Sequence, residues 1–153
     1  MTSAPGDPWT LFGTGPRGVL VTLKRDGRPQ LSNVGYLYDT AAQVVLISAT
    51  DDRAKTRNLR RDPRASFYVT TPDLGAYVVG EGLAELGSVA HDPHDVVVDQ
   101  LVDHYRALQG EHSDWADFRA AMVRERRLLV RLPLAHAYGW APDGNAASDR
   151  VRR

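Results

Sequence analysis

Short runs of β-branched and aromatic residues, separated by turn residues, are the feature that most constrains the fold of this chain. The run Val44–Ile47 is apolar throughout, too short for a helix and rich in residues that favour strands. The same pattern predicts strands over residues 19–24, 30–38, 44–47, 64–70, 76–86, 128–132 and 135–140. Because only one long crossover separates these strands, we predict a mainly β fold: an antiparallel barrel with peripheral helices, not a doubly wound parallel sheet.

Turn residues mark where these strands begin and end. The pair Asp26-Gly27 supplies the positive backbone angles of a tight hairpin between the first two strands, which continue with 44–47 as a three-stranded meander. Gly80 and Gly82 predict a bulge or a bend inside the strand 76–86. Pro133 is expected to separate the last two strands.

Capping residues and prolines predict the helices. A carboxylate or hydroxyl at the start satisfies free amide groups, and proline favours the first helical position. The predicted helices run from Asp7 through Phe12, from Thr50 or Asp51 to Asp62, from Asp92 to Gly110, and from Ser113 or Asp114 past Met122.

Length and composition limit the possible classes of protein. With 153 residues, the chain is expected to form one domain over residues 1–140, followed by a polar, disordered tail over 141–153. The absence of cysteine excludes a disulfide framework, a thiolate metal site and a cysteine nucleophile. No start signal and no long apolar segment is present, so we expect a cytoplasmic protein without membrane association.

Cations are concentrated in one segment. Six of the 19 Lys and Arg residues lie between Arg53 and Arg64, although the net charge of the chain is zero: Arg53, Lys55, Arg57, Arg60, Arg61 and Arg64. The hydroxyls of Ser48 and Thr50, helix-start amides and these cations are the donors that phosphate oxygens need. A solvated surface helix explains the same pattern, so the residues by themselves leave both interpretations open.

Other ligand classes have less support. The segment Gly13–Gly18 matches G-x-G-x-x-G, but a strand follows it where a dinucleotide site needs a helix. The basic segment lacks aromatic residues for base stacking, so we do not expect nucleic acid as a partner. The histidines follow no metal-ligand spacing, so no metal site is predicted. Hydrolysis and phosphoryl transfer have no motif.

Asn33 stands in the middle of a predicted strand among apolar neighbours. An inward-facing amide there needs a hydrogen-bond partner, whereas an outward-facing amide carries no constraint. The sequence leaves both orientations open.

Five stretches carry a family resemblance: GRPQLSNVGY, RAKTRNLRRDPRAS, VVGEGLAEL, GEHSDW and HAYGW. Together they resemble the actinobacterial deazaflavin-binding branch of the pyridoxamine 5'-phosphate oxidase-like (FMN-binding) split β-barrel proteins, over nearly the whole chain. The resemblance implies an antiparallel split β-barrel and a homodimer with two cofactor sites along the subunit interface.

The resemblance also implies three groups of cofactor-binding residues. The phosphate would be held by Arg53, Lys55 and Asn58, supported by Ser48, Ala49 and Thr50 at the strand end. The tricyclic ring would lie near Gln30, Ser32 and Asn33. Tyr77 would come from the other subunit.

The implied function is that of an oxidoreductase that uses coenzyme F420 to transfer hydride to a small unsaturated organic substrate, with no residue assigned a catalytic role. An FMN-dependent enzyme on the same barrel and a non-catalytic F420 carrier are the alternatives, because a phosphate site does not distinguish the two cofactors. Two features depart from the family. Gly75 stands where relatives can carry a large aromatic residue, and the ending SDRVRR differs from the R-L-x-P ending of true pyridoxamine phosphate oxidases, which argues against vitamin metabolism.

Overall fold

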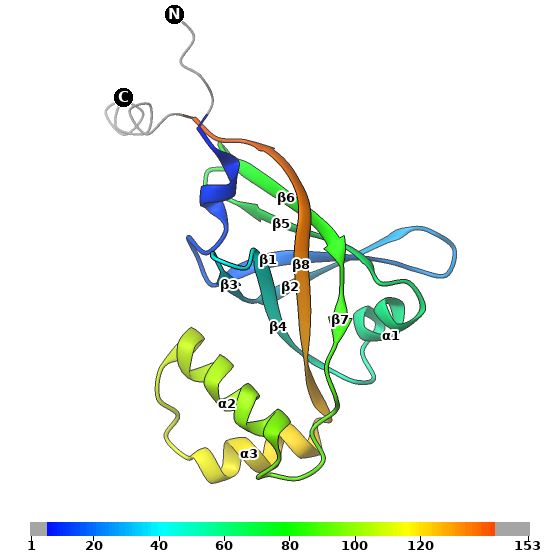
Figure 1. Ribbon diagram of the computed structural model, residues 1–153, viewed down its shortest axis with the longest axis vertical. Coiled ribbons are helices and arrows are strands. Elements are labelled where there is room, and N and C mark those ends of the chain that lie inside the picture. The colour runs from blue at the N-terminus through cyan, green and yellow to red at the C-terminus, as the bar shows by residue number, and fades with distance from the viewer. Residues whose placement is uncertain (1–5, 143–153) are drawn as a thin grey trace, which may run out of the picture.

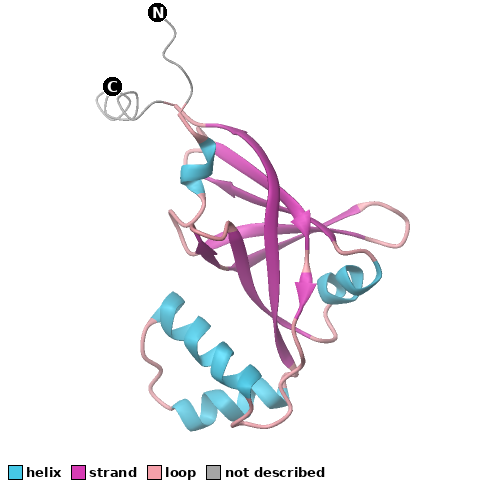
Figure 2. Ribbon diagram, viewed as in Figure 1, coloured by secondary structure: helices cyan, strands magenta, loops and turns pink. Residues whose placement is uncertain are grey.

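A computed structural model describes residues 6–142 of the chain, so the predicted tail lies outside the described residues from 143 on. The strands curve around one core, with two helices below it and a short helix at its side (Figures 1 and 2). The helical elements are η1 (Pro8–Leu11), α1 (Ala54–Arg61), α2 (Val96–Gln109) and α3 (Trp115–Arg124). The strands are β1 (Arg17–Leu23), β2 (Pro29–Gly35), β3 (Leu37–Asp39), β4 (Val44–Thr50), β5 (Arg64–Thr70), β6 (Tyr77–Leu83), β7 (Glu85–Leu86) and β8 (Arg127–Trp140).

The sheet curves so that its two edge strands, β2 and β3, meet at Tyr36. Its antiparallel strands follow the order β2-β1-β5-β6-β8-β4-β3, and β7 pairs with β8. The first and last strands of this path are consecutive in the chain and are joined through Tyr36. The predicted mainly β antiparallel architecture with peripheral helices is therefore confirmed.

Tyr36 also corrects the prediction of a single strand over residues 30–38. Its side chain is buried, its amide donates to the carbonyl of Pro16 at 3.0 Å, and its hydroxyl accepts from the amide of Gly13 at 2.8 Å. The chain bends here because the ring enters the core, and the strand partner changes from β1 to β4. The expected three-stranded meander is thus divided into two pairs.

Strand β8 corrects the prediction of two strands separated by Pro133. It is continuous, pairs with β4 up to Pro133 and with β6 from Leu134 onward. The missing amide of Pro133 costs little because it falls where β8 exchanges one partner for the other. The predicted irregularity near Gly82 is confirmed as a shift of register, since Gly82 pairs with Leu134 and Glu81 with His136. The extra residue of the bulge is Ala135 of β8, and the predicted strand 76–86 is divided into β6 and β7.

Helix α1 begins later than predicted. Its N-cap is Arg53, without a side-chain cap, and not Thr50 or Asp51. Thr50 still pairs with Arg127 in the β4–β8 ladder, and the Asp51 amide donates to the carbonyl of Arg126 at 3.0 Å, so both residues belong to the strand end. Hydrogen bonds from Arg126 and Arg60 hold the pKa of Asp51 below its usual value.

Helices α2 and α3 pack together below the barrel (Figure 1). The N-cap of α2 is Asp95 and not the predicted Asp92, because the Asp95 carboxylate accepts from the Val98 amide at 2.7 Å. Gly110 ends this helix at a φ of 84°, and Asp114 caps α3, both as predicted. Across residues 6–142, no helix is long and apolar enough to cross a membrane, and no cluster of side chains is suited to a metal ion.

Two hydrophobic clusters stabilise this arrangement. The larger fills the barrel and includes Leu20, Ile47 and Phe67, while the smaller lies under α2 and α3 and includes Leu101 and Phe118. Ser48 on the outer face of β4 lines the same cavity as Leu101 and Phe118 of this smaller cluster. Strand β4 ends at Thr50, shortly before α1 begins.

Candidate functional site

The junction between β4 and α1 gathers the polar side chains of the candidate site. Side chains alternate along β4, so Ala49 packs in the barrel core while Ser48 and Thr50 face outward. Of the three residues predicted at this strand end, Ala49 can therefore offer a ligand only its backbone. Ser48 and Thr50 can offer hydroxyl groups.

Three cations belong to the same junction. Arg53 caps α1, Lys55 lies in its first turn, and Arg127 is the residue of β8 that pairs with Thr50. Burial, followed by the charges of Arg53 and Arg127, lowers the pKa of Lys55. An ammonium group placed beside two guanidinium groups is destabilised by repulsion, and a bound anion would relieve that repulsion.

Thr50 supplies an independent sign that this junction is built for a ligand. Its Oγ1 atom is the one buried side-chain nitrogen or oxygen atom among residues 6–142 that has no hydrogen-bond partner. Buried polar atoms are nearly always paired, so an unpaired one requires an explanation. A phosphate oxygen accepting from this hydroxyl would supply the missing partner, so the residues present fit a phosphate-bearing cofactor.

Arg127 is the member of this cluster that the sequence analysis missed. Its Nε donates to Glu125 at 2.7 Å and its Nη1 contacts the Ser48 hydroxyl at 3.4 Å. No local pattern marks Arg127, because it lies 72 positions after Lys55 in the numbering and meets the junction only through strand pairing. A predicted β4–β8 register would have been the signal needed to find it.

Asn58 and Gln30 form a separate, buried network on the inner side of α1. The Asn58 side-chain amide donates to Gln30 Oε1 at 2.6 Å and to the Thr22 hydroxyl at 3.1 Å. Its Oδ1 accepts from Arg61 at 3.1 Å, and Arg61 also donates to the carbonyl of Leu23 at 2.7 Å. These contacts bind α1 to the hairpin formed by β1 and β2.

The remaining predicted residues lie on different faces of the sheet. Ser32 pairs with the buried Leu20 and shares the inner side of β2 with Gln30. Asn33 is exposed and faces outward, which answers the question that the sequence left open. Tyr77 is exposed on β6, on the same outer face as Asn33, since Asn33 is aligned through Val19 and Tyr68 with Val79. The structure therefore does not bring all ten predicted residues together within one subunit.

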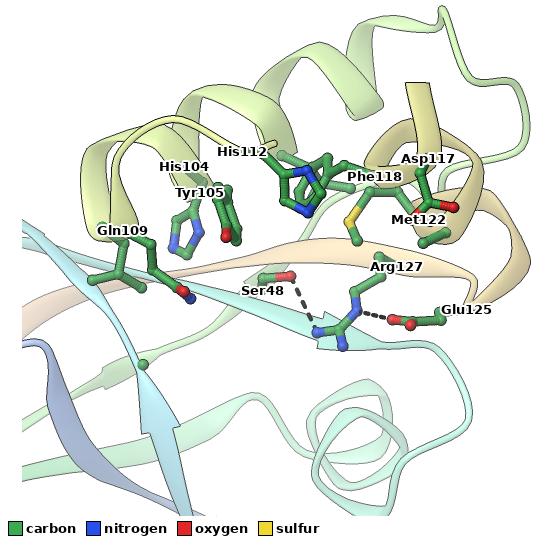
Figure 3. Close-up of a pocket in the computed structure, with 14 residues that line it drawn as sticks. Ser48, His104, Tyr105, Gln109, His112, Asp117, Phe118, Met122, Glu125 and Arg127 are labelled. Atoms are coloured by element: carbon green, nitrogen blue, oxygen red, sulfur yellow. Dashed lines mark hydrogen bonds and ion pairs between the residues drawn. The ribbon is translucent and has the colours of Figure 1, made fainter. Parts of the chain in front are cut away.

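A cavity of about 380 Å³ adjoins the junction. It lies between the helices α2 and α3 on one side and the outer face of β4 and β8 on the other (Figure 3). Ser48 and Arg127 belong to both the cavity and the junction. No pattern in the sequence predicted a cavity beneath these helices.

Taken together, the strand order and the bulged β8 define an antiparallel split β-barrel, with a polar, cation-rich junction at the end of β4. The model of the pyridoxamine 5'-phosphate oxidase family matches residues 11–141, and the chain belongs to this family. Members of the family are mostly flavin- or deazaflavin-dependent oxidoreductases.

Solved structures of the same fold differ in their described roles. A conserved hypothetical protein from Mycobacterium tuberculosis is 22% identical with a TM-score of 0.66, over 87% of this chain and 81% of that one. An F420 reductase is 24% identical with a TM-score of 0.60, over 88% and 98%. A heme-binding protein from Mycobacterium smegmatis is 22% identical with a TM-score of 0.65, over 94% of this chain and 57% of that one. These likenesses establish the fold, and the function has to be argued from the site.

Proposed function

We propose that this protein is an oxidoreductase that binds coenzyme F420 and transfers hydride between the deazaflavin and a small unsaturated organic substrate. One observation carries the proposal: the unpaired, buried hydroxyl of Thr50 lies at a junction with the cations Arg53, Lys55 and Arg127. Membership of a family of mostly flavin- and deazaflavin-dependent oxidoreductases is consistent with it, as is the likeness to an F420 reductase.

The residues of the junction would bind the cofactor phosphate. Lys55 and Arg53 supply charge, Thr50 and Ser48 supply hydroxyl donors, and the Ala49 backbone completes the strand end. Asn58 already donates both amide hydrogens within the protein, so its contribution would be to hold α1, and with it Lys55, in place. The bound deazaflavin would supply the hydride chemistry, and the protein would orient the ring and exclude water from it.

The proposal includes a homodimer. The outer face of β5, β6 and the end of β8 carries exposed aromatic side chains, with Tyr138 48% and Trp140 45% accessible. Tyr77 lies beside Trp140 in the strand register and 6.1 Å from the ring of Tyr68. An exposed aromatic patch of this kind is typical of a protein interface, and Asn33 would reach the ring from one subunit and Tyr77 from its partner, whereas Ser32 lies on the inner side of β2 and points away from this face.

Equilibrium titration with F420 and, separately, with FMN tests the cofactor. We expect tighter binding of F420, and tighter binding of FMN would assign the protein to the FMN-dependent members of the family. Turnover of F420H2 with a panel of conjugated organic acceptors then separates an enzyme from a carrier, which would bind the cofactor without consuming it.

Replacement of Lys55 tests the phosphate site. Lys55→Ala should weaken F420 binding by about 1.5–3 kcal/mol, the range for a hydrogen bond to a charged group. Arg28→Ala removes an exposed cation from the β1–β2 hairpin and should leave the affinity unchanged. An unaltered dissociation constant for a folded Lys55→Ala variant would contradict the assignment of the junction.

A further inference from the structure

The cavity between the sheet and the helices α2 and α3 has properties that the cofactor proposal does not use. Its volume of about 380 Å³ lies within the range of pockets that bind small organic molecules. Of the predicted cofactor residues, only Ser48 lines it. The remaining walls come from α2, α3 and the loops that flank α3, the start of β8 and Gly35 at the end of β2.

The helix side of the cavity suits a flat ring. Tyr105 and Phe118 lie with their ring centroids 4.9 Å apart, and Met122 lies on the same side one turn further along α3 (Figure 3). Aromatic faces and a flexible thioether adapt well to a planar, polarisable partner. A planar aromatic body therefore fits this wall better than a branched aliphatic one.

The sheet side of the cavity offers hydrogen-bond donors. Arg127 lies between Ser48 and Glu125 at the base of the cavity (Figure 3). Its Nη2 has no partner among residues 6–142, and two N–H groups there are free to donate to a ligand. The Ser48 hydroxyl can donate as well.

His112 adds a further donor, and its tautomer follows from its hydrogen bond. The Asp114 amide donates to His112 Nδ1 at 2.9 Å, so Nδ1 must carry a lone pair. The neutral ring therefore carries its proton on Nε2. Figure 3 shows this imidazole directed from the helix side into the cavity.

The charge at the base of the cavity favours an anion. Glu125 is the carboxylate paired with Arg127, and it lies at the surface with 41% of its side chain accessible. Asp117, the second carboxylate of the lining, is also exposed, at the mouth. Arg127 and Arg53 both act on the charge of Lys55, so Arg127 belongs to a cluster of three cations that outweighs the single carboxylate of Glu125 paired with it.

We infer that this cavity binds a planar aromatic carboxylate, with the ring against Tyr105, Phe118 and Met122 and the carboxylate on Arg127. This inference goes beyond the proposed function, because the site can be occupied and measured without any cofactor. In an enzyme, the same site would hold the aromatic acid beside the cofactor junction.

Calorimetric titration of the cofactor-free protein with 1-naphthoate and with the neutral 1-naphthalenemethanol tests the ligand class. We expect 1-naphthoate to bind at least about tenfold more tightly, since a hydrogen bond between charged groups is worth about that factor. Equal affinities, or no binding of 1-naphthoate at millimolar concentration, would overturn the inference.

Two matched pairs of variants locate the site. Arg127→Met should lower the affinity for 1-naphthoate at least about tenfold and leave that for the alcohol nearly unchanged. Arg131→Met, on the same strand but outside this cavity, should change neither. Ala121→Phe fills the cavity and should abolish binding of both probes, whereas Ala120→Phe, at the exposed neighbouring position, should not.

Thermal unfolding identifies any variant that fails to fold. If a variant of one pair fails to fold, the affinities measured with the other pair test the location of the ligand. Tight binding of 1-naphthoate to a folded Ala121→Phe variant would place the ligand outside the cavity and overturn the inference. Because F420 is absent from all these titrations, failure of the cofactor proposal and failure of this inference give separate results.

Discussion

Thr50 and Lys55 are two residues of the β4–α1 junction whose side chains lie in unfavourable surroundings in the free protein. The Thr50 hydroxyl is buried without a partner, and the Lys55 ammonium is partly buried beside Arg53 and Arg127. Both features are unfavourable in the free protein and favourable once an anion binds. Such local conflicts are expected where a protein has kept a site for a ligand.

Because the charge of Lys55 destabilises the folded protein, we predict that replacing Lys55 raises the free energy of unfolding in a pH-dependent way. Its pKa in the folded protein is below that in the unfolded chain, so the unfavourable charge is fully present at neutral pH and is lost as the pH rises through the lowered pKa. Lys55→Met should therefore raise the free energy of unfolding at pH 7 by up to about 1 kcal/mol. This gain in the free energy of unfolding should become smaller as the pH approaches 10.5, the ordinary pKa of a lysine side chain.

Urea unfolding at pH 7 and pH 10 measures this difference. Lys24→Met, at an exposed position on the hairpin, should give no such gain. A Lys55→Met variant less stable than the native chain at pH 7 would show that Lys55 stabilises the free protein.

Asn58 tests a different role at the same scale. Asn58→Ala leaves the Thr22 hydroxyl and the Gln30 carbonyl without their donor, and should lower the free energy of unfolding by about 1–3 kcal/mol. Urea unfolding measures this loss, and the double variant with Thr22→Val should lose less than the sum of the two single changes. Additive losses would mean that the two side chains do not interact.

At the scale of elements, the bulge in β8 decides which side chains face outward. Before Ala135, the even-numbered residues such as Leu132 and Leu134 point into the core. After it, the even-numbered residues Tyr138 and Trp140 point outward. One extra residue in the strand reverses the alternation, because side chains along a strand have a period of two.

Gly82 permits this bulge and gives the prediction at the element scale. A Cβ atom at Gly82 would overlap the carbonyl oxygen of Pro133, which is backbone and cannot move aside easily. Gly82→Ala should therefore lower the free energy of unfolding by about 2–4 kcal/mol, the range of strongly destabilising substitutions. Gly15→Ala, where an added Cβ meets no atom within 4 Å, should have little effect. Thermal unfolding of the two variants compares them, and equal melting temperatures would mean that the strand accommodates the methyl group.

At the scale of the whole molecule, the exposed aromatic face determines the expected assembly. Light scattering at micromolar concentration should report a dimer, as the proposed shared site requires. Trp140→Glu places a charge on this face beside Tyr77 and should produce a monomer. Val96→Glu, which replaces a side chain that is 68% accessible on α2, should leave the dimer intact. A native chain that is monomeric would contradict the shared site.

Much of the fold could be predicted from local patterns. Asp26-Gly27 predicted the first hairpin, Gly110 the end of α2 and Asp114 the start of α3, because turns and caps depend on a few neighbouring residues. The predictions for Thr50 and Pro133 were wrong because distant partners override local preference there, and the prediction for Asp92 was wrong because the nearby Asp95 caps the helix instead. Thr50 is kept in β4 by its ladder with β8, and Pro133 lies where β8 changes partner.

Some features of the candidate site could likewise be predicted from the sequence, and others could not. Sequence by itself determined the composition of the basic segment, the position of Ser48 and Thr50 at a strand end, and the likeness to a known family. Only the tertiary structure brought Arg127 to Lys55, paired Asn58 with Gln30 and Thr22, turned Asn33 and Tyr77 to the outer face, and formed the cavity beneath α2 and α3. The reason is physical: short-range order follows from neighbouring residues, whereas these contacts depend on strand pairing across the whole chain, which no local pattern encodes.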